Sequence, residues 1–337
     1  MGSGNLFLLK QTGSESVTCL SYVFYSRRTG TRRIEMDNPS NTRSHPVLSD
    51  TTKGLLAGLM VVLCWSGFNI VSRFGSKGVF TPFDLAAMRY GVSGLLGSAY
   101  FLRNVPYAEW PRYVLLSVFG GLGYGLLVYS GFSFAPSAHA GIFVNGGIPF
   151  CTVVIVALTT GFHLARQTLL ALLVSGVGLL FIGIDSLLSH HGEAEFMGDL
   201  LFLAAALSWA IFGILMRRWQ IRPLLGICGI ACFAMLLYWP VYLLYLPKNL
   251  PMAGWKDITL QCVYQGVIAA MLAASLYSYS NQKIGACQAS MMLALVPAVS
   301  AIGAYFILDE QLTWTVMLGI VIVSTGAIVG AMPIRAK

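Results

Sequence analysis

The chain has 337 residues, of which 56% are hydrophobic and only 10% are charged, and its formal net charge is +8. A soluble domain has about a quarter of its residues charged, so this composition excludes an ordinary water-soluble fold. The basic excess is typical of the cytoplasmic ends of membrane helices, and we expect no nucleic-acid partner.

The first segment, residues 1–50, is polar and basic and contains no apolar run long enough for a secretory signal. We expect it to be a disordered cytoplasmic tail. Met36 opens a stretch that resembles a short cytoplasmic leader. We therefore hypothesise that residues 1–35 are a start-site artefact.

Apolar runs of roughly 20 residues follow one another from residue 54 onward, a length that matches the ~30 Å hydrocarbon core at 1.5 Å per residue. The predicted transmembrane helices are 54–74, 83–103, 112–134, 136–160, 166–187, 198–216, 223–246, 257–281, 284–308 and 311–332. The expected fold class is therefore all-α, a polytopic membrane protein of about ten transmembrane helices.

Two copies of one pattern divide these helices into halves. LMVVLCWSGFNIVSR in the first half matches LAAALSWAIFGILMR in the second, with Trp65 and Trp209 separated by 144 residues. A later segment, Tyr129 to Pro149, matches Tyr277 to Pro297 at an offset of 148. A repeated unit of five helices must enter the membrane in the opposite orientation, so we predict two inverted five-helix repeats at 54–187 and 198–332. In such folds the substrate site lies between the repeats near the bilayer midplane.

Basic residues also predict the topology. Outside the tail, nine fall on the cytoplasmic side and four on the other if the N-terminus is inside. We expect a multi-pass protein of the cell membrane, plasma or inner, with both termini cytoplasmic. Six of the seven cysteines fall within apolar runs as small hydrophobic residues, and no Cys/His cluster suggests a metal, so we expect no metal and no cofactor.

The sequence resembles the EamA-type ten-helix members of the drug/metabolite transporter superfamily over residues 54–332. The resemblance is most specific in SWAIFGILMRR and in the stretch from GACQASMMLALVP to STGAIVG. The matching positions are Trp65, Pro82, Arg89 and Pro149 in the first half and Pro297, Glu310, Gly319, Gly326 and Gly330 in the second. Phe162 stands where a first-half counterpart of Glu310 would be, so the acid is unpaired in the pattern. The resemblance implies export or uptake of amino acids, related metabolites or drugs, with proton coupling as one energy source.

Ionisable groups inside lipid are costly and mark candidate sites. Arg89, about two turns inside its helix, needs a carboxylate, carbonyl groups, water or an anionic substrate; a structural role or snorkelling to the interface is the alternative. His139 either takes a proton and couples transport or packs as a neutral, hydrogen-bonded side chain. Asp84, Asp185, Asp199 and Glu310 all fall near helix ends.

Prolines within helices free backbone carbonyls, which are tolerated at membrane depth only against protein or a water-filled cavity. Pro149 and Pro297 are therefore candidate helix-break or gating residues. The run from Asn145 to Pro149 either lines a cavity or packs between helices. The candidate substrate-binding residues are Trp65, Asn69, Arg89, Tyr129, His139, Asn145, Trp209, Tyr277 and Gln288. We expect Tyr124, Tyr238, Tyr242 and Tyr245 in the aromatic belt at the membrane interface.

These observations favour a secondary transporter that moves small metabolites such as amino acids or drug-like compounds by alternating access. Its expected partners are the substrate, the lipid bilayer and, as coupling ion, protons; a monomer and a homodimer both remain open. The pattern GxxxxGK[ST] is absent, which argues against ATP drive. An intramembrane enzyme is the alternative, although no catalytic pair is visible, and a non-transporting receptor or assembly partner is another.

Overall fold

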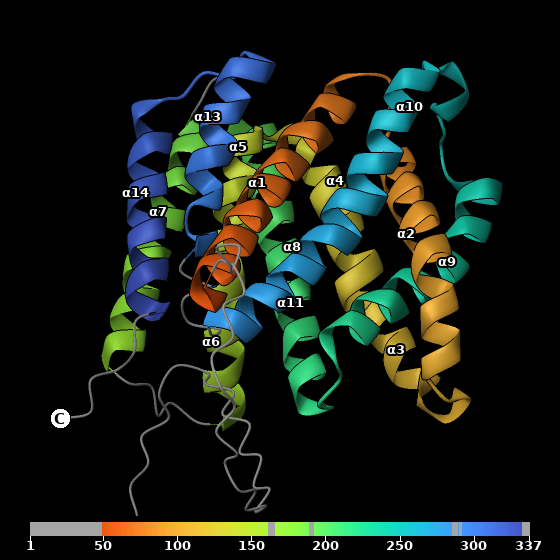
Figure 1. The fold of residues 1–337 in the computed structure, drawn as a ribbon. Coiled ribbons are helices and arrows are strands. Elements are labelled where there is room, and N and C mark those ends of the chain that lie inside the picture. The colour runs from red at the N-terminus through yellow and green to blue at the C-terminus, as the bar shows by residue number, and fades with distance from the viewer. Residues whose placement is uncertain (1–48, 161–165, 189–191, 285–288, 290–291, 332–337) are drawn as a thin grey trace, which may run out of the picture.

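The computed structural model describes residues 49–160, 166–188, 192–284, 289 and 292–331, and residues 1–48 of the predicted N-terminal tail lie outside them. The described residues of the first half form helices that follow the predicted spans closely (Figure 1). They are α1 (Asp50–Lys77), α2 (Pro82–Asn104), η1 (Tyr107–Glu109), α3 (Trp110–Leu116), η2 (Ser117–Gly123), α4 (Tyr124–Phe134), α5 (Ser137–Ala140), η3 (Gly141–Gly146), α6 (Gly147–Thr160) and α7 (Arg166–Leu188).

The second half repeats this order with the same kinds of element. Its helices are α8 (Gly192–Arg218), α9 (Pro223–Tyr245), η4 (Leu250–Met252), α10 (Trp255–Gln261), η5 (Cys262–Leu272), α11 (Ala273–Ile284), α13 (Val296–Leu308) and α14 (Trp314–Ala331). No strand occurs in the described part of the chain. The all-α prediction is thus confirmed, as lipid requires of an open chain because backbone groups must be satisfied within each helix.

Six described helical segments are long and apolar enough to cross a bilayer: Asp50–Lys77, Tyr107–Phe134, Ser137–Val156, Glu193–Arg218, Pro223–Tyr245 and Trp255–Ile284. Shorter apolar helices span Leu169–Asp185, Val296–Leu308 and Trp314–Val329. Local sequence sets several helix starts. At α2, for example, Thr81 and Asp84 form a capping box and Pro82 occupies the first turn.

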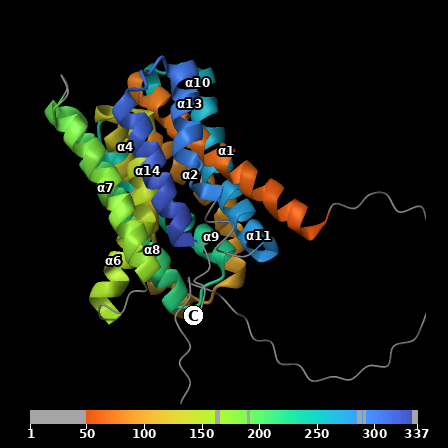
Figure 2. The ribbon, with the colours of Figure 1, turned by 90° about the vertical axis from the view of Figure 1, so that its left-hand side faces the viewer.

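Helix packing relates the halves by a pseudo-two-fold arrangement. α2 packs on α9 and α7 on α14, so equivalent helices pair across the halves; α1 packs on α11 just as α8 packs on α4. Figures 1 and 2 show the α7–α14 pair side by side, and in Figure 1 the α2–α9 pair lies at the opposite edge. Figure 1 also shows α1 and α8 running in opposite directions, as inverted repeats require.

Close approach of paired helices depends on glycine. A Cβ on Gly97 of α2 would lie 3.2 Å from Cα of Cys228 in α9, and one on Gly326 of α14 would lie 2.8 Å from the backbone nitrogen of Ser175 in α7. Backbones this close gain dispersion contacts in lipid, where burial of apolar side chains supplies little driving force.

Some spans are not regular α-helices. The third and eighth spans contain π-helical segments, η2 and η5, at corresponding places in the two halves, and η3 follows α5 within the fourth span. The ninth span turns at Ala294 and Leu295 before α13 begins, with Pro297 in its first turn. Such interruptions are typical of functional sites in transporters.

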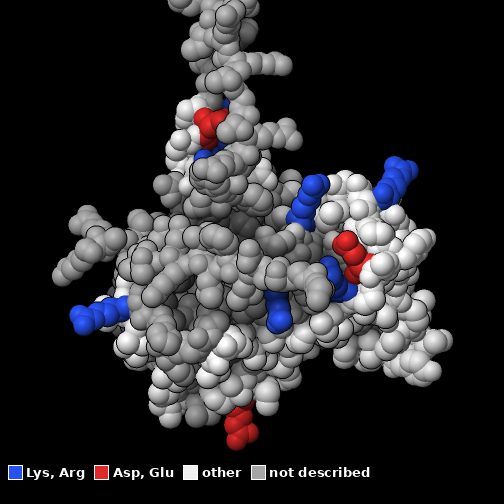
Figure 3. Space-filling view, turned by 90° about the horizontal axis from the view of Figure 1, so that it is seen from below, with Lys and Arg blue, Asp and Glu red and all other residues white. Residues whose placement is uncertain are grey.

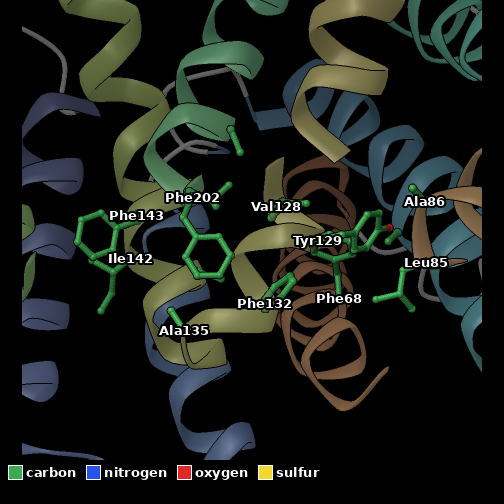
Figure 4. Packing of buried hydrophobic residues seen from close by; sticks show 14 of the residues in the cluster. Phe68, Leu85, Ala86, Val128, Tyr129, Phe132, Ala135, Ile142, Phe143 and Phe202 are labelled. Atoms are coloured by element: carbon green, nitrogen blue, oxygen red, sulfur yellow. The ribbon is translucent and has the colours of Figure 1, made fainter. Parts of the chain in front are cut away.

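A buried aromatic core joins the halves near the middle of the bundle. Phe132 of α4 contacts Phe68 of α1, with ring centroids 6.2 Å apart, and Phe202 of α8, with centroids 5.1 Å apart (Figure 4). The end of the bundle where α1 begins carries basic side chains around its rim (Figure 3). Those in the described residues include Arg103, Arg112, Arg217, Arg218 and Arg222.

Candidate functional site

Arg89 of α2 lies in an aromatic environment. Its guanidinium carbon is 5.3 Å from the ring centroid of Phe68 and 5.9 Å from that of Tyr124, and the phenol groups of Tyr90 and Tyr129 are also close. Phe68 and Tyr129 lie next to each other in Figure 4. Within the described residues no Asp or Glu oxygen lies within 4.0 Å of the guanidinium. The charge is therefore stabilised by ring faces.

Trp209 extends this aromatic group into the second half. Its ring centroid is 4.7 Å from that of Tyr124. The prediction that Tyr124 belongs to the membrane-interface belt is wrong, because Tyr124 lies between Arg89 and Trp209. Tyr238 and Tyr242 are likewise buried in the protein, where their hydroxyls bond to the Phe83 carbonyl and the Asp84 carboxylate. Tyr245, in contrast, is 80% exposed.

Tyr129 is held by a buried chain of amides that sequence reasoning missed. Its hydroxyl donates to Oε1 of Gln265 at 2.9 Å, and Nε2 of Gln265 donates to Ser72 Oγ and to Gln261 Oε1, each at 3.0 Å. Gln261 in turn donates to the Val71 carbonyl at 2.8 Å. Two glutamines four residues apart in an apolar span were the available signal, since they share one helix face.

A polar stripe on α1, formed by Ser66, Asn69, Arg73 and Lys77, faces α13 and the residues that follow it. Ser66 donates to the Val296 carbonyl at 3.3 Å, and Asn69 Nδ2 donates to Ser300 Oγ at 3.0 Å. Asn69, predicted to bind substrate, thus connects helices of the two halves in this structure.

At the end of this stripe, Glu310 binds several groups of the first half. Its Oε1 lies 2.9 Å from Arg73 Nε and 3.4 Å from Lys77 Nζ, and its Oε2 accepts the Ser137 backbone N–H at 2.9 Å. Arg73 also donates to the Phe132 carbonyl. We call Arg73, Lys77, Ser137 and Glu310 the Glu310 cluster. The sequence showed the acid and the base separately and gave no sign that they meet.

His139 of α5 is paired with Asp199 of α8. The distance from Nδ1 to Oδ1 is 2.8 Å, and the residues are only 4% and 1% exposed. Asp199 falls near a helix end in sequence but is buried in the fold. An acid and a base from opposite halves therefore meet inside the bundle, where isolated charges would be costly.

This helical architecture, with paired halves and few charged side chains inside, agrees with the comparison with known families. Residues 52–184 and 196–331 each match the EamA-like transporter family. The chain belongs to this family. The expected resemblance is thus confirmed, and the protein is a multi-pass membrane transporter.

Relatives of this EamA-like transporter carry transporter names. A "Probable amino-acid metabolite efflux pump" of Escherichia coli (strain K12) is 26% identical, covering 84% of this chain and 95% of that protein. An "Uncharacterized transporter YyaM" of Bacillus subtilis (strain 168) is 22% identical, covering 77% of this chain and 87% of that protein. A solved crystal structure has a TM-score of 0.57 at 21% identity, covering 83% of this chain and 97% of that chain, and so shows the same fold.

The transporter's remaining predicted site residues lie in separate places. Trp65 pairs with Tyr277, with ring centroids 5.6 Å apart, and so links α1 to α11. Asn145 lies in η3 and Pro149 in the first turns of α6. The adjacent Gly146 and Gly147 pack against α14 and α8, respectively. Gln288 lies outside the described residues.

Proposed function

We propose that this protein is a secondary transporter of the cell membrane that carries small metabolites bearing a carboxylate group, such as amino acids, by alternating access between its halves. The observation that carries the proposal is the Arg89 guanidinium, which is surrounded by aromatic rings and has no carboxylate among the described residues within 4.0 Å. A positive charge at membrane depth is retained when it serves function.

The chemistry of the surrounding side chains supports a substrate with two parts. Arg89 presents a planar fork that suits a carboxylate, while Phe68, Tyr124 and Trp209 offer ring faces to an apolar or aromatic portion. The name of the Escherichia coli relative, an amino-acid metabolite efflux pump, is consistent with this class.

The orientation is part of the proposal. Basic residues cluster at the end where α1 begins and α14 ends, whereas Asp185, Glu193, Glu195 and Asp199 lie at the end where α7 finishes and α8 begins. Under the positive-inside rule the first end faces the cytoplasm, so both termini are cytoplasmic and the Glu310 cluster faces the outside.

Counterflow into proteoliposomes tests the proposal with labelled amino acids as substrates. Arg89→Gln removes the charge, and loss of a charge-assisted hydrogen bond of ~1.5–3 kcal/mol should raise the apparent Kd by roughly 10- to 150-fold. Arg89→Lys should recover only part of the affinity, because an ammonium lacks the planar fork.

Arg103→Gln is the matched control, since Arg103 is an exposed arginine at the other end of the same helix. It should leave transport unchanged. The amides of the same substrates should be insensitive to Arg89→Gln. If a folded Arg89→Gln variant transports the free acids with normal affinity, the proposed carboxylate site is wrong.

A further inference from the structure

A small cavity lies beside His139 at the end of the bundle where α8 begins. Its volume is about 90 Å³, and its polar lining includes His139, Asp185, Glu195 and Glu310. A buried water needs about 10–15 Å³ by this measure and two to four polar partners, so the cavity has room and partners for several waters. Water there would bring protons to the imidazole.

The pairing with Asp199 defines how His139 would bind a proton. An ionised carboxylate only accepts hydrogen bonds, so the hydrogen of the neutral imidazole belongs on Nδ1, which donates to Asp199 at 2.8 Å. Nε2 is then the basic nitrogen. A carboxylate behind a histidine fixes the tautomer and stabilises the imidazolium formed when Nε2 gains a proton.

One member of the Glu310 cluster, Glu310 itself, also lines this cavity. The Glu310 carboxylate is bonded to Ser137, which lies two residues before His139 in the four-residue helix α5. It is also bonded to Arg73 and Lys77 of α1. Ser137 of the cluster therefore lies in the same helix as His139, and Glu310 lines the same cavity.

Among the described residues, charged groups reach this site from several of the elements around it. α8 contributes Asp199 and Glu195, α7 contributes Asp185, the end of α13 is followed by Glu310, and α1 contributes Arg73 and Lys77. α4 and η3, which also pack on α5, contain no Asp, Glu, Lys, Arg or His, and the titratable groups of α4 are the phenols of Tyr124 and Tyr129. The described residues thus place four acidic groups and two basic ones around the site.

We propose that the cavity is an external proton-binding site and that protonation of His139 releases the Glu310 cluster, opening the outer face. This inference rests on the proposed alternating access. A proton from outer water binds Nε2, and the new imidazolium competes with Arg73 and Lys77 for carboxylate groups in the cavity. The same proton returns to outer water when the cluster re-forms, so no other bond is made or broken. Outer opening should therefore be favoured at acidic external pH.

Accessibility of Ser137 provides a direct readout. Ser137 is fully buried, and its backbone N–H donates to the Glu310 carboxylate. In a variant without native cysteines, the thiol introduced by Ser137→Cys should be protected from a membrane-impermeant maleimide while the cluster is closed. As external pH falls from about 8 to about 5.5, labelling in intact cells should increase in proportion to the fraction of His139 that is protonated. On the basic side of a titration this fraction grows about tenfold for each pH unit.

Glu193→Cys, at an exposed position near the start of α8, is the control for the reactivity of the thiol itself. A thiol reacts with maleimide as the thiolate, so its intrinsic labelling rate falls as pH falls, which is opposite to the increase expected at Ser137→Cys. Relative to this control, the pH response should vanish in His139→Gln, and His139→Lys should stay accessible at all pH values. A response that is unchanged in His139→Gln would overturn the proposal.

The labelling assay needs no substrate, so the two proposals can fail separately. If carboxylate transport is absent but labelling still follows His139, only the proposed substrate class fails. If transport depends on Arg89 but labelling ignores His139, the proton site fails alone. Failure of Glu193→Cys to label from outside would refute the orientation and, with it, the external location of this site.

Discussion

Arg73 and Glu310 allow a quantitative test of whether the halves are held together at their outer ends. Glu310→Gln keeps the shape of the side chain and removes its charge, while Arg73→Gln removes the charge on the other side. The paired side chains are only 14% and 7% exposed, so the site is largely dry. Glu310→Gln removes the carboxylate that pairs with Arg73, whereas Arg73→Gln leaves Glu310 with Lys77, whose Nζ lies 3.4 Å from Oε1.

Breaking a fully buried ion pair costs about 3–5 kcal/mol. We expect less here, about 2–3 kcal/mol of unfolding free energy for each single variant, because Arg73 retains the Phe132 carbonyl and Glu310 retains the Ser137 N–H. The double variant should lose less than the sum, which gives a coupling energy of about 1–2 kcal/mol. Unfolding by SDS in mixed micelles, followed by tryptophan fluorescence, measures these differences.

Lys283 and Asp50 are the matched control pair. Their charged atoms are also 2.9 Å apart and also join the two halves, but the side chains are 30% and 65% exposed. Water screens such a pair, so its cycle should show no resolvable coupling. If both cycles give coupling within error of zero, burial of the Glu310 cluster contributes nothing to stability and our reasoning about it is wrong.

Two further variants test the buried polar contacts by the same unfolding measurement. Gln265→Leu removes three hydrogen bonds and should lower the unfolding free energy by about 2–3 kcal/mol. Gln282→Leu, on an exposed surface, is the control and should change it little. Equal effects of the two variants would contradict a stabilising role of the buried amide chain. Thr81→Val removes the capping box with Asp84 and should lower the unfolding free energy by about 1 kcal/mol. Thr159→Val is the control, because the Thr159 hydroxyl donates to a carbonyl of its own helix. Equal effects of the two variants would contradict a stabilising role of the cap.

The fold followed from the sequence because its main determinants are local. The length of each apolar run sets the length of a helix in lipid, and the repeated tryptophan pattern at Trp65 and Trp209 indicated a duplicated unit. The break in the ninth span was only approximately predicted. Pro297 marked it, but the turn itself lies at Ala294 and Leu295, where no strong breaker stands.

The candidate site was predicted less completely because it depends on contacts between distant residues. Arg89 was recognisable as a lone charge in an apolar run. Its aromatic partners were not, since Tyr124 was equally compatible with the membrane interface. His139 and Asp199 are separated by 60 residues, and Arg73 and Glu310 by 237. Periodicity within one helix carries no information on which residue of another helix lies opposite.

The polar stripe on α1 has a mechanical consequence. Its inner members, Ser66 and Asn69, use neutral hydrogen bonds to α13, whereas its outer members, Arg73 and Lys77, use charges that a proton can disturb. The hydrogen bonds of Ser66 and Asn69 can therefore stay in place as a pivot while the ion pairs of Arg73 and Lys77 break. The part of α1 from Asn69 to Lys77 is about 12 Å long at 1.5 Å per residue, so a tilt of this segment by about 10° would move Lys77 by about 2 Å. The outer end of α1 would then move relative to α13, while the contacts between the two helices deeper in the bundle stay intact.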